Sequence, residues 1–113
     1  MAMITLHGQG NFETIAQAIL DGVQASGISC TLVDNVSRNV GTAKLTVMVF
    51  EKYYMRASNR ASLTVVMTGE GDRIVIDAIG AGGGQGALLG FSWGAEEDFV
   101  GTVARVLSDF GFK

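Results

Sequence analysis

Between residues 28 and 79 the chain alternates apolar side chains with other residues at a period of two, in four successive runs. Successive side chains of a β-strand point to opposite faces, so this alternation is typical of strands. Three short turn sequences separate the runs, at residues 39–41, 57–59 and 69–72. Connections this short join antiparallel neighbours. The chain is therefore expected to contain a four-stranded antiparallel meander.

Helical patterns stand on both sides of this meander. Apolar residues recur at the spacing of one helical face from Phe12 to Val23 and again from Phe99 to Phe110. Asn11 is a suitable N-cap for the first helix, and Gly111 ends the second. A short apolar run at residues 3–6 predicts one more strand at the start. The predicted fold is α+β with two layers, a curved antiparallel sheet and two helices on one face, in the order strand, helix, four strands, helix.

Length and charge limit the class of protein. With 113 residues the chain is long enough for one domain and too short for two, so we expect a single domain over residues 1–113. A net charge of -3 argues against nucleic acid and anionic membranes as partners. No run approaches the roughly 18 apolar residues of a membrane span. Cys30 is the single cysteine, which excludes an intrachain disulfide and favours a reducing, cytoplasmic location.

Both faces of the predicted sheet are apolar. The face expected under the helices consists of Ala43, Leu45, Val47, Val49, Leu63, Val65, Met67, Ile74 and Ile76. The opposite face would then consist of Thr46, Met48, Phe50, Thr64, Val66, Thr68, Val75 and Ile79. A sheet face in contact with water normally carries charged or strongly polar side chains. The second face is therefore expected to be covered.

A second copy of the chain is the simplest cover, because a two-fold axis lets one patch meet itself. We predict a homodimer or higher homo-oligomer that associates through Met48, Phe50, Val66 and Val75. Two alternatives remain open. In the first, no cover is needed, because the residues are assigned to the wrong faces or because a threonine-rich face is tolerated in water. In the second, the face forms an apolar ligand site.

Aromatic residues suggest where a ligand would bind. Trp93 and Phe91 lie between a glycine-rich segment and the last helix, where they would line a pocket for a small apolar ligand between helix and sheet. Tyr53 and Arg56 belong to the one cluster of basic and aromatic residues, which is able to stack on a base or clamp a carboxylate. The plainer interpretation of this cluster is the solvated tip of a hairpin.

Catalytic and cofactor patterns are weak. Residues 82–87 match the glycine spacing of dinucleotide binders, but the second parallel strand which that site requires does not follow. With His7 as the single histidine and one cysteine, we predict neither a metal site nor a cofactor. A non-enzymatic binding or assembly module is expected. The alternative is a small enzyme that uses Glu51 and Asp77 in a cleft under the glycine-rich segment at 80–94.

The order of elements resembles the TBP-like and helix-grip architectures, in which a curved sheet holds a long C-terminal helix. The run from Phe50 to Arg60, the turn at residues 69–73, the glycine-rich segment and the acidic start of the last helix resemble a family of uncharacterised bacterial proteins known only as a domain of unknown function. This resemblance supports the fold and implies no activity.

Overall fold

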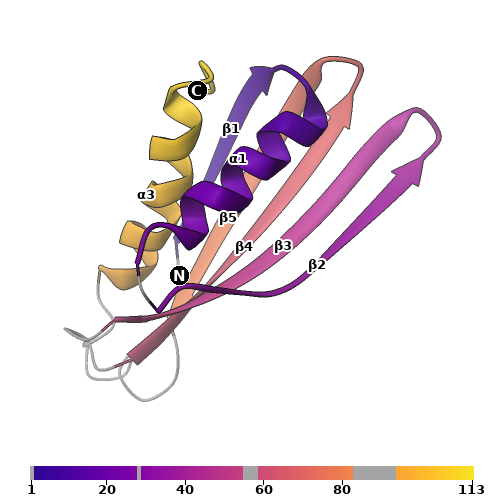
Figure 1. Cartoon of the computed structure of the whole chain (residues 1–113). Coiled ribbons are helices and arrows are strands. Elements are labelled where there is room, and N and C mark those ends of the chain that lie inside the picture. The colour runs from indigo at the N-terminus through magenta and orange to yellow at the C-terminus, as the bar shows by residue number, and fades with distance from the viewer. Residues whose placement is uncertain (1, 28, 55–58, 83–93) are drawn as a thin grey trace.

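The computed structural model describes residues 2–27, 29–54, 59–82 and 94–113. Its elements are, in chain order, β1 (Ala2–Gln9), α1 (Phe12–Gln24), β2 (Thr31–Val40), β3 (Ala43–Tyr54), β4 (Asn59–Glu70), β5 (Arg73–Gly82) and α3 (Ala95–Ser108). The five strands form one antiparallel sheet in the order β1-β5-β4-β3-β2, and both helices lie on one face of it (Figure 1). The predicted α+β class and the order of its elements are confirmed.

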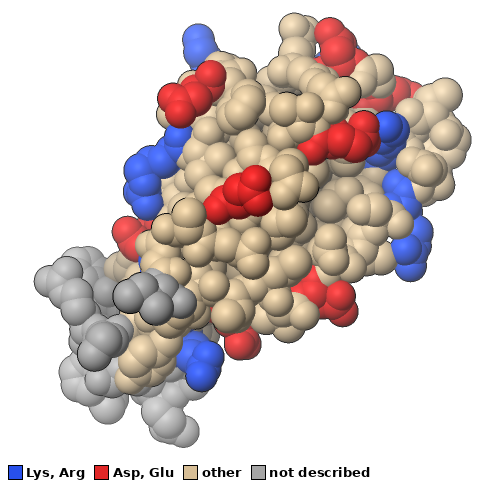
Figure 2. All heavy atoms as spheres, in the orientation of Figure 1, with Lys and Arg blue, Asp and Glu red and all other residues tan. Residues whose placement is uncertain are grey.

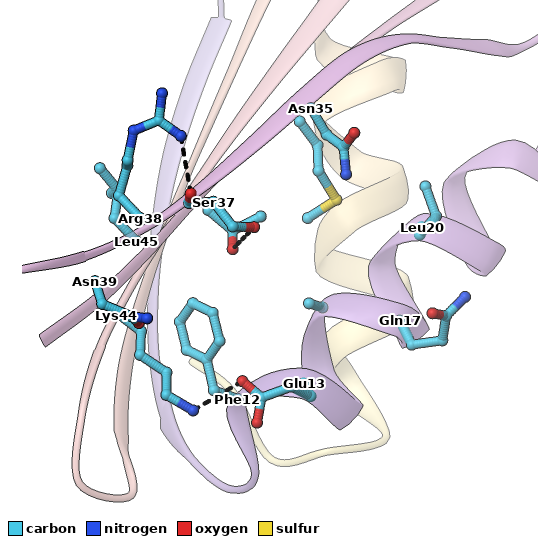
Figure 3. A pocket seen from close by; sticks show the side chains of 13 residues that line it. Phe12, Glu13, Gln17, Leu20, Asn35, Ser37, Arg38, Asn39, Lys44 and Leu45 are labelled. Carbon is cyan, nitrogen blue, oxygen red and sulfur yellow. Dashed lines mark hydrogen bonds and ion pairs between the residues drawn. The ribbon is translucent and has the colours of Figure 1, made fainter.

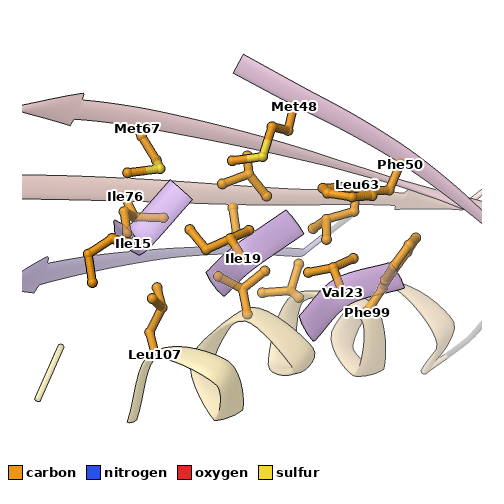
Figure 4. Packing of buried hydrophobic residues seen from close by; sticks show 14 of the residues in the cluster. Ile15, Ile19, Val23, Met48, Phe50, Leu63, Met67, Ile76, Phe99 and Leu107 are labelled. Atoms are coloured by element: carbon orange, nitrogen blue, oxygen red, sulfur yellow. The ribbon is translucent and has the colours of Figure 1, made fainter. Parts of the chain in front are cut away.

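The helices form where the apolar stripes predict them. The Asn11 side chain accepts a hydrogen bond from the Thr14 N–H at 2.9 Å and so caps the start of α1. Ile19 and Val23 of α1 and Phe99 of α3 are fully buried between the helices and the sheet (Figure 4). Each helix therefore supplies one apolar face to a single core.

The predicted faces of β3 are reversed. Met48 and Phe50, expected on the face away from the helices, are 2% and 0% exposed and lie in the core (Figure 4). Paired residues of a ladder share a face, and β3 pairs Phe50 with Leu63 of β4, which the helices cover. Burying Met and Phe also removes more apolar surface from water than burying Val, so the larger side chains lie under the helices.

The predicted faces of β4 and β5 are correct. The side chains of these strands that lie under the helices are Leu63, Val65, Met67, Ile74 and Ile76. The side chains of β3 that therefore point away from the helices are Ala43, Leu45, Val47 and Val49.

The first strand is longer than predicted, and the C-terminal residues explain why. β1 continues through Gly8 to Gln9, where a loop was expected. A Cβ on Gly8 would lie 2.6 Å from the ring of Phe112, so glycine leaves room for this ring. Gly111 has φ of 79° and turns the chain, which buries Phe112 while Phe110 is left 41% exposed. The second helical stripe therefore ends before Phe110, and Phe112 completes the core.

Helix α3 approaches β5 most closely at Gly80. A Cβ on this residue would lie 2.8 Å from the Glu96 carbonyl oxygen, a backbone atom that cannot rotate away. We expect Gly80→Ala to lower the free energy of unfolding by about 1–3 kcal/mol, because the helix must shift outward.

The matched control is Gly101→Ala on α3 itself, where the added Cβ would have only the flexible Arg105 side chain at 3.4 Å. This change is expected to raise stability by about 0.5–1 kcal/mol, since alanine favours the helix. Urea unfolding of both variants measures the two effects. Equal stability of Gly80→Ala and the unchanged chain would contradict the close contact.

Candidate functional site

The face of the sheet opposite the helices, called here the open face, has an apolar centre. Among the described residues, both helices lie on the other side of the sheet (Figure 1). Val36, Val47 and Val66 occupy neighbouring ladder positions on β2, β3 and β4 and form one continuous row. The apolar side chains around this row are Met3, Leu45, Val49, Val75 and Ile79.

Charged and polar groups surround this centre. The Asp77 carboxylate accepts a hydrogen bond from the Thr5 hydroxyl at 2.6 Å on the β1 side. Arg60 and Glu51 form an ion pair of 4.0 Å between β4 and β3. The open face therefore combines apolar side chains with charges of both signs, and Asp77 lies among the apolar residues, level with Val66. Apolar surface with polar groups beside it is common in protein interfaces.

Two of the four predicted interface residues lie on this face. Val66 and Val75 belong to the open face and are half-buried in the single chain. Met48 and Phe50 are core residues and cannot contact a partner. Val47 and Val49 lie on the open face instead, because each is next in sequence to a residue of β3 whose side chain is buried under the helices. The period-two pattern assigned the faces of β4 and β5 correctly but not which side chains of β3 the helices cover.

Of the four predicted ligand residues, the structure describes Tyr53. Trp93, Phe91 and Arg56 lie outside the described residues. Tyr53 is 40% exposed on the open face, near the end of β3. Its neighbour Tyr54 points to the opposite face, so the strand separates the two rings of the predicted aromatic cluster.

Tyr54 is held by contacts that the sequence did not reveal. Its hydroxyl donates a hydrogen bond to Asp98 at 3.1 Å, and its ring meets Phe99 edge-on at 6.1 Å between centroids. The Lys52 ammonium lies 4.9 Å from the same ring and donates a hydrogen bond to the Ser26 carbonyl at 3.1 Å. Burial, reinforced by the hydrogen bond to Asp98 and its charge, raises the pKa of Tyr54 well above its ordinary value.

The raised pKa of Tyr54 has a consequence for stability in alkali. The unfolded tyrosine ionises at its ordinary pKa of about 10, while the folded one stays protonated, so the stabilisation from this group is present below pH 10 and is lost as the pH rises further. We expect the free energy of unfolding of Tyr54→Phe to fall less steeply above pH 10 than that of the unchanged chain. Urea unfolding at pH 8 and at pH 11 makes the comparison, and parallel losses would contradict it.

The two carboxylates of the enzyme alternative are not close together. Glu51 and Asp77 both lie on the open face, but two strands apart and four residues apart along the strand direction, since Asp77 is level with Val47. The spacing of the strands and the rise per residue place the Cα atoms of Glu51 and Asp77 about 17 Å apart. Carboxylate pairs that share a reaction at one bond lie within about 10 Å.

The β2–β3 hairpin extends past the helices (Figure 1). A cleft lies between α1 and this hairpin. This α1–β2 cleft has a volume of about 460 Å³. Phe12, Leu20 and Met48 contribute apolar surface, and Asn35 and Gln17 contribute side-chain amides (Figure 3).

Two polar contacts shape the cleft. An ion pair of 3.0 Å between Lys44 and Glu13 closes one end (Figure 3). The Ser37 and Thr46 hydroxyls hydrogen-bond to each other at 3.0 Å along the strand wall. Alternation had placed Thr46 on the face of the sheet away from the helices, so this cleft was not predicted.

The reactive side chains are far from one another in the fold. Cys30 is buried, and this burial raises the pKa of its thiol. His7 is exposed on the open face, so it does not face the buried thiol. Within the described ranges, no group of three or more His, Cys, Asp or Glu side chains is arranged to hold a metal ion.

The helix-bearing side carries acidic and basic side chains scattered over it, without a patch of one sign in this view of the described residues (Figure 2). None of the described helices has the length and apolar character needed to cross a membrane.

Fold and site together define a two-layer α+β domain with one covered and one open sheet face. Residues 1–111 match the model of a family of unknown function (DUF6054). The chain belongs to this family, which confirms the predicted resemblance to a family of unknown function. Neither a curated protein nor a solved structure matches the chain.

Proposed function

We propose that this protein is a non-enzymatic assembly module that forms a homo-oligomer through the open face of its sheet. The observation that carries this proposal is the apolar row of Val36, Val47 and Val66, which charged groups of both signs surround. Leaving such a row in water forgoes stabilisation of about 25 cal/mol for each Å² of apolar surface.

The size of the open face supports a second copy as the cover. Five strands about 4.8 Å apart, paired over roughly eight residues, give a footprint of roughly 500 Å² in each copy. Two such faces in contact bury about 1,000 Å², which is the lower limit of a specific interface. The β-branched side chains lose little rotamer entropy on packing, which favours association further.

The double variant Val47→Thr/Val66→Thr tests the proposal. Threonine keeps the shape and strand preference of valine but places hydroxyl groups in the proposed interface. We expect the unchanged chain to be an oligomer at micromolar concentration and the variant to dissociate at least about tenfold more readily, measured by sedimentation velocity.

Val40→Thr is the comparison variant, because Val40 lies on the same face but at the hairpin end, four residues from Val36, and is 69% exposed. It is expected to weaken association less than the double variant. An unchanged chain that stays a monomer at about 100 µM would refute assembly through this face.

A second candidate function is the binding of a small molecule with apolar and hydrogen-bonding parts, and the α1–β2 cleft favours it. Its volume of about 460 Å³ falls in the range of small-ligand sites. Amide groups of Asn35 and Gln17 above apolar Leu20 would suit a ligand of mixed character.

The substitution Ala16→Phe would fill this cleft from the α1 wall. We expect native mass spectrometry of the protein purified from its own host to show a bound small molecule in the unchanged chain and loss of this mass in Ala16→Phe. Gln24→Phe, at an exposed position of α1 that does not line the cleft, is the matched control. If both the unchanged chain and Ala16→Phe show only the mass of the protein without a bound molecule, binding in the cleft is refuted.

A further inference from the structure

The two edges of the sheet differ. At the β1 edge, the His7 N–H donates to the Lys113 carbonyl at 2.9 Å, and the Lys113 N–H donates to the His7 carbonyl at 3.0 Å. The chain thus pairs this edge, at His7, with its own Lys113. At the other edge, β2 pairs with β3 alone in the described part of the chain, over ten residues of which nine are exposed. A long exposed edge strand is a template for pairing with another chain.

Side chains of β2 satisfy two backbone groups of this edge in the single chain. The Asn35 N–H donates to the Asp34 carboxylate at 2.8 Å, and the Arg38 guanidinium donates to the Ser37 carbonyl at 3.0 Å. Alternate residues of an antiparallel strand direct their N–H and C=O groups to opposite sides. Asn35 and Ser37 are therefore the residues whose backbone groups face away from β3.

The charges of β2 select one way for this strand to pair with its own copy. A two-fold axis at Val36 places Asp34 opposite Arg38 of the second copy, and the same pair forms again on the other side of the axis. Moving the axis to Asp34 or to Arg38 places like charges opposite each other, which is destabilising. An axis at Asn35 or Ser37 pairs neither charge. Only the axis at Val36 places both Asp34 and Arg38 opposite a residue of opposite charge.

This register also matches the backbone. With the axis at Val36, Asn35 lies opposite Ser37 of the second copy. The Asn35 N–H then donates to the Ser37 carbonyl of the second copy, so both groups that the side chains satisfy in the single chain are bonded within the new ladder. Asp34 and Arg38 are released to form the two ion pairs across the axis.

We infer that β2 pairs antiparallel with β2 of a second copy of this chain, about a two-fold axis at Val36, and joins the two sheets edge to edge. The apolar row of Val36, Val47 and Val66 then continues across the axis into the second copy. This contact is separate from packing through the open face, and either one can exist without the other.

A cysteine at the axis tests the register directly. In a Cys30→Ala background, Val36→Cys places two thiols opposite each other across the edge. Opposite residues without mutual hydrogen bonds have Cα atoms about 4.5 Å apart, which suits a disulfide. Sheets packed face to face lie about 10 Å apart, which is too far. A disulfide at this position therefore reports edge pairing and not contact through the open face.

Val40→Cys in the same background is the matched control, because Val40 is 69% exposed and Val36 is 40% exposed. Random collision would oxidise the more exposed thiol faster, whereas the axis at Val36 leaves the two Val40 positions far apart. We expect a disulfide-linked dimer to form at least about tenfold faster with Val36→Cys, also when Val47→Thr/Val66→Thr is added. Equal rates, or a faster reaction of Val40→Cys, would overturn the inference.

Charge reversal supplies an independent test in the cysteine-free chain. Asp34→Arg alone and Arg38→Asp alone each place like charges opposite each other, so each variant is expected to dimerise about tenfold more weakly. An equal mixture of the two variants restores both ion pairs and is expected to form heterodimers, detected by native mass spectrometry. Homodimers as tight as those of the unchanged chain, or a mixture that does not form heterodimers, would overturn the proposed register.

Discussion

The pairing of β3 with β4 is the constraint on which the rest of the structure depends. It places Phe50 beside Leu63 and Met48 beside Val65, and these four side chains form the floor on which the helices pack. Because paired residues share a face, this one register decides which side chains of β3 meet the helices and which meet water. A slip by one residue would exchange the two sets.

The open face follows from the same register. Once the larger apolar residues of β3 are buried, its valines are left on the other side, and Val47 is level with Val66 on β4 and Val36 on β2. Most positions of this face are strand positions that favour β-branched side chains, whereas Asp77 places one charge in the middle of β5, level with Val66. The same β-branched residues thus favour the strand conformation and make this surface resemble an interface.

The cleft and the free edge have a common cause in the position of the β2–β3 hairpin. Helix α3 packs against β1, β5 and β4 and helix α1 meets β2, while the turn end of the hairpin extends past both helices (Figure 1). The side of β2 that faces the cleft carries polar residues, among them Asn35 and Ser37. The Asp34 carboxylate and the Arg38 guanidinium satisfy backbone groups along the outer edge. The same two charged side chains are those on which the proposed pairing of β2 with a second copy depends.

The sequence by itself determined the class of fold, the order of the elements and the positions of both helices, because local periodicity and capping residues such as Asn11 report them directly. It also determined that the sheet has two apolar faces. Only the tertiary structure decided which side chains of β3 the helices cover, that Phe112 and not Phe110 completes the core, and that Glu51 and Asp77 lie far apart. The physical reason is that these outcomes depend on register and strand order, which are set by contacts between residues distant in the chain and leave no periodic signal within any one segment.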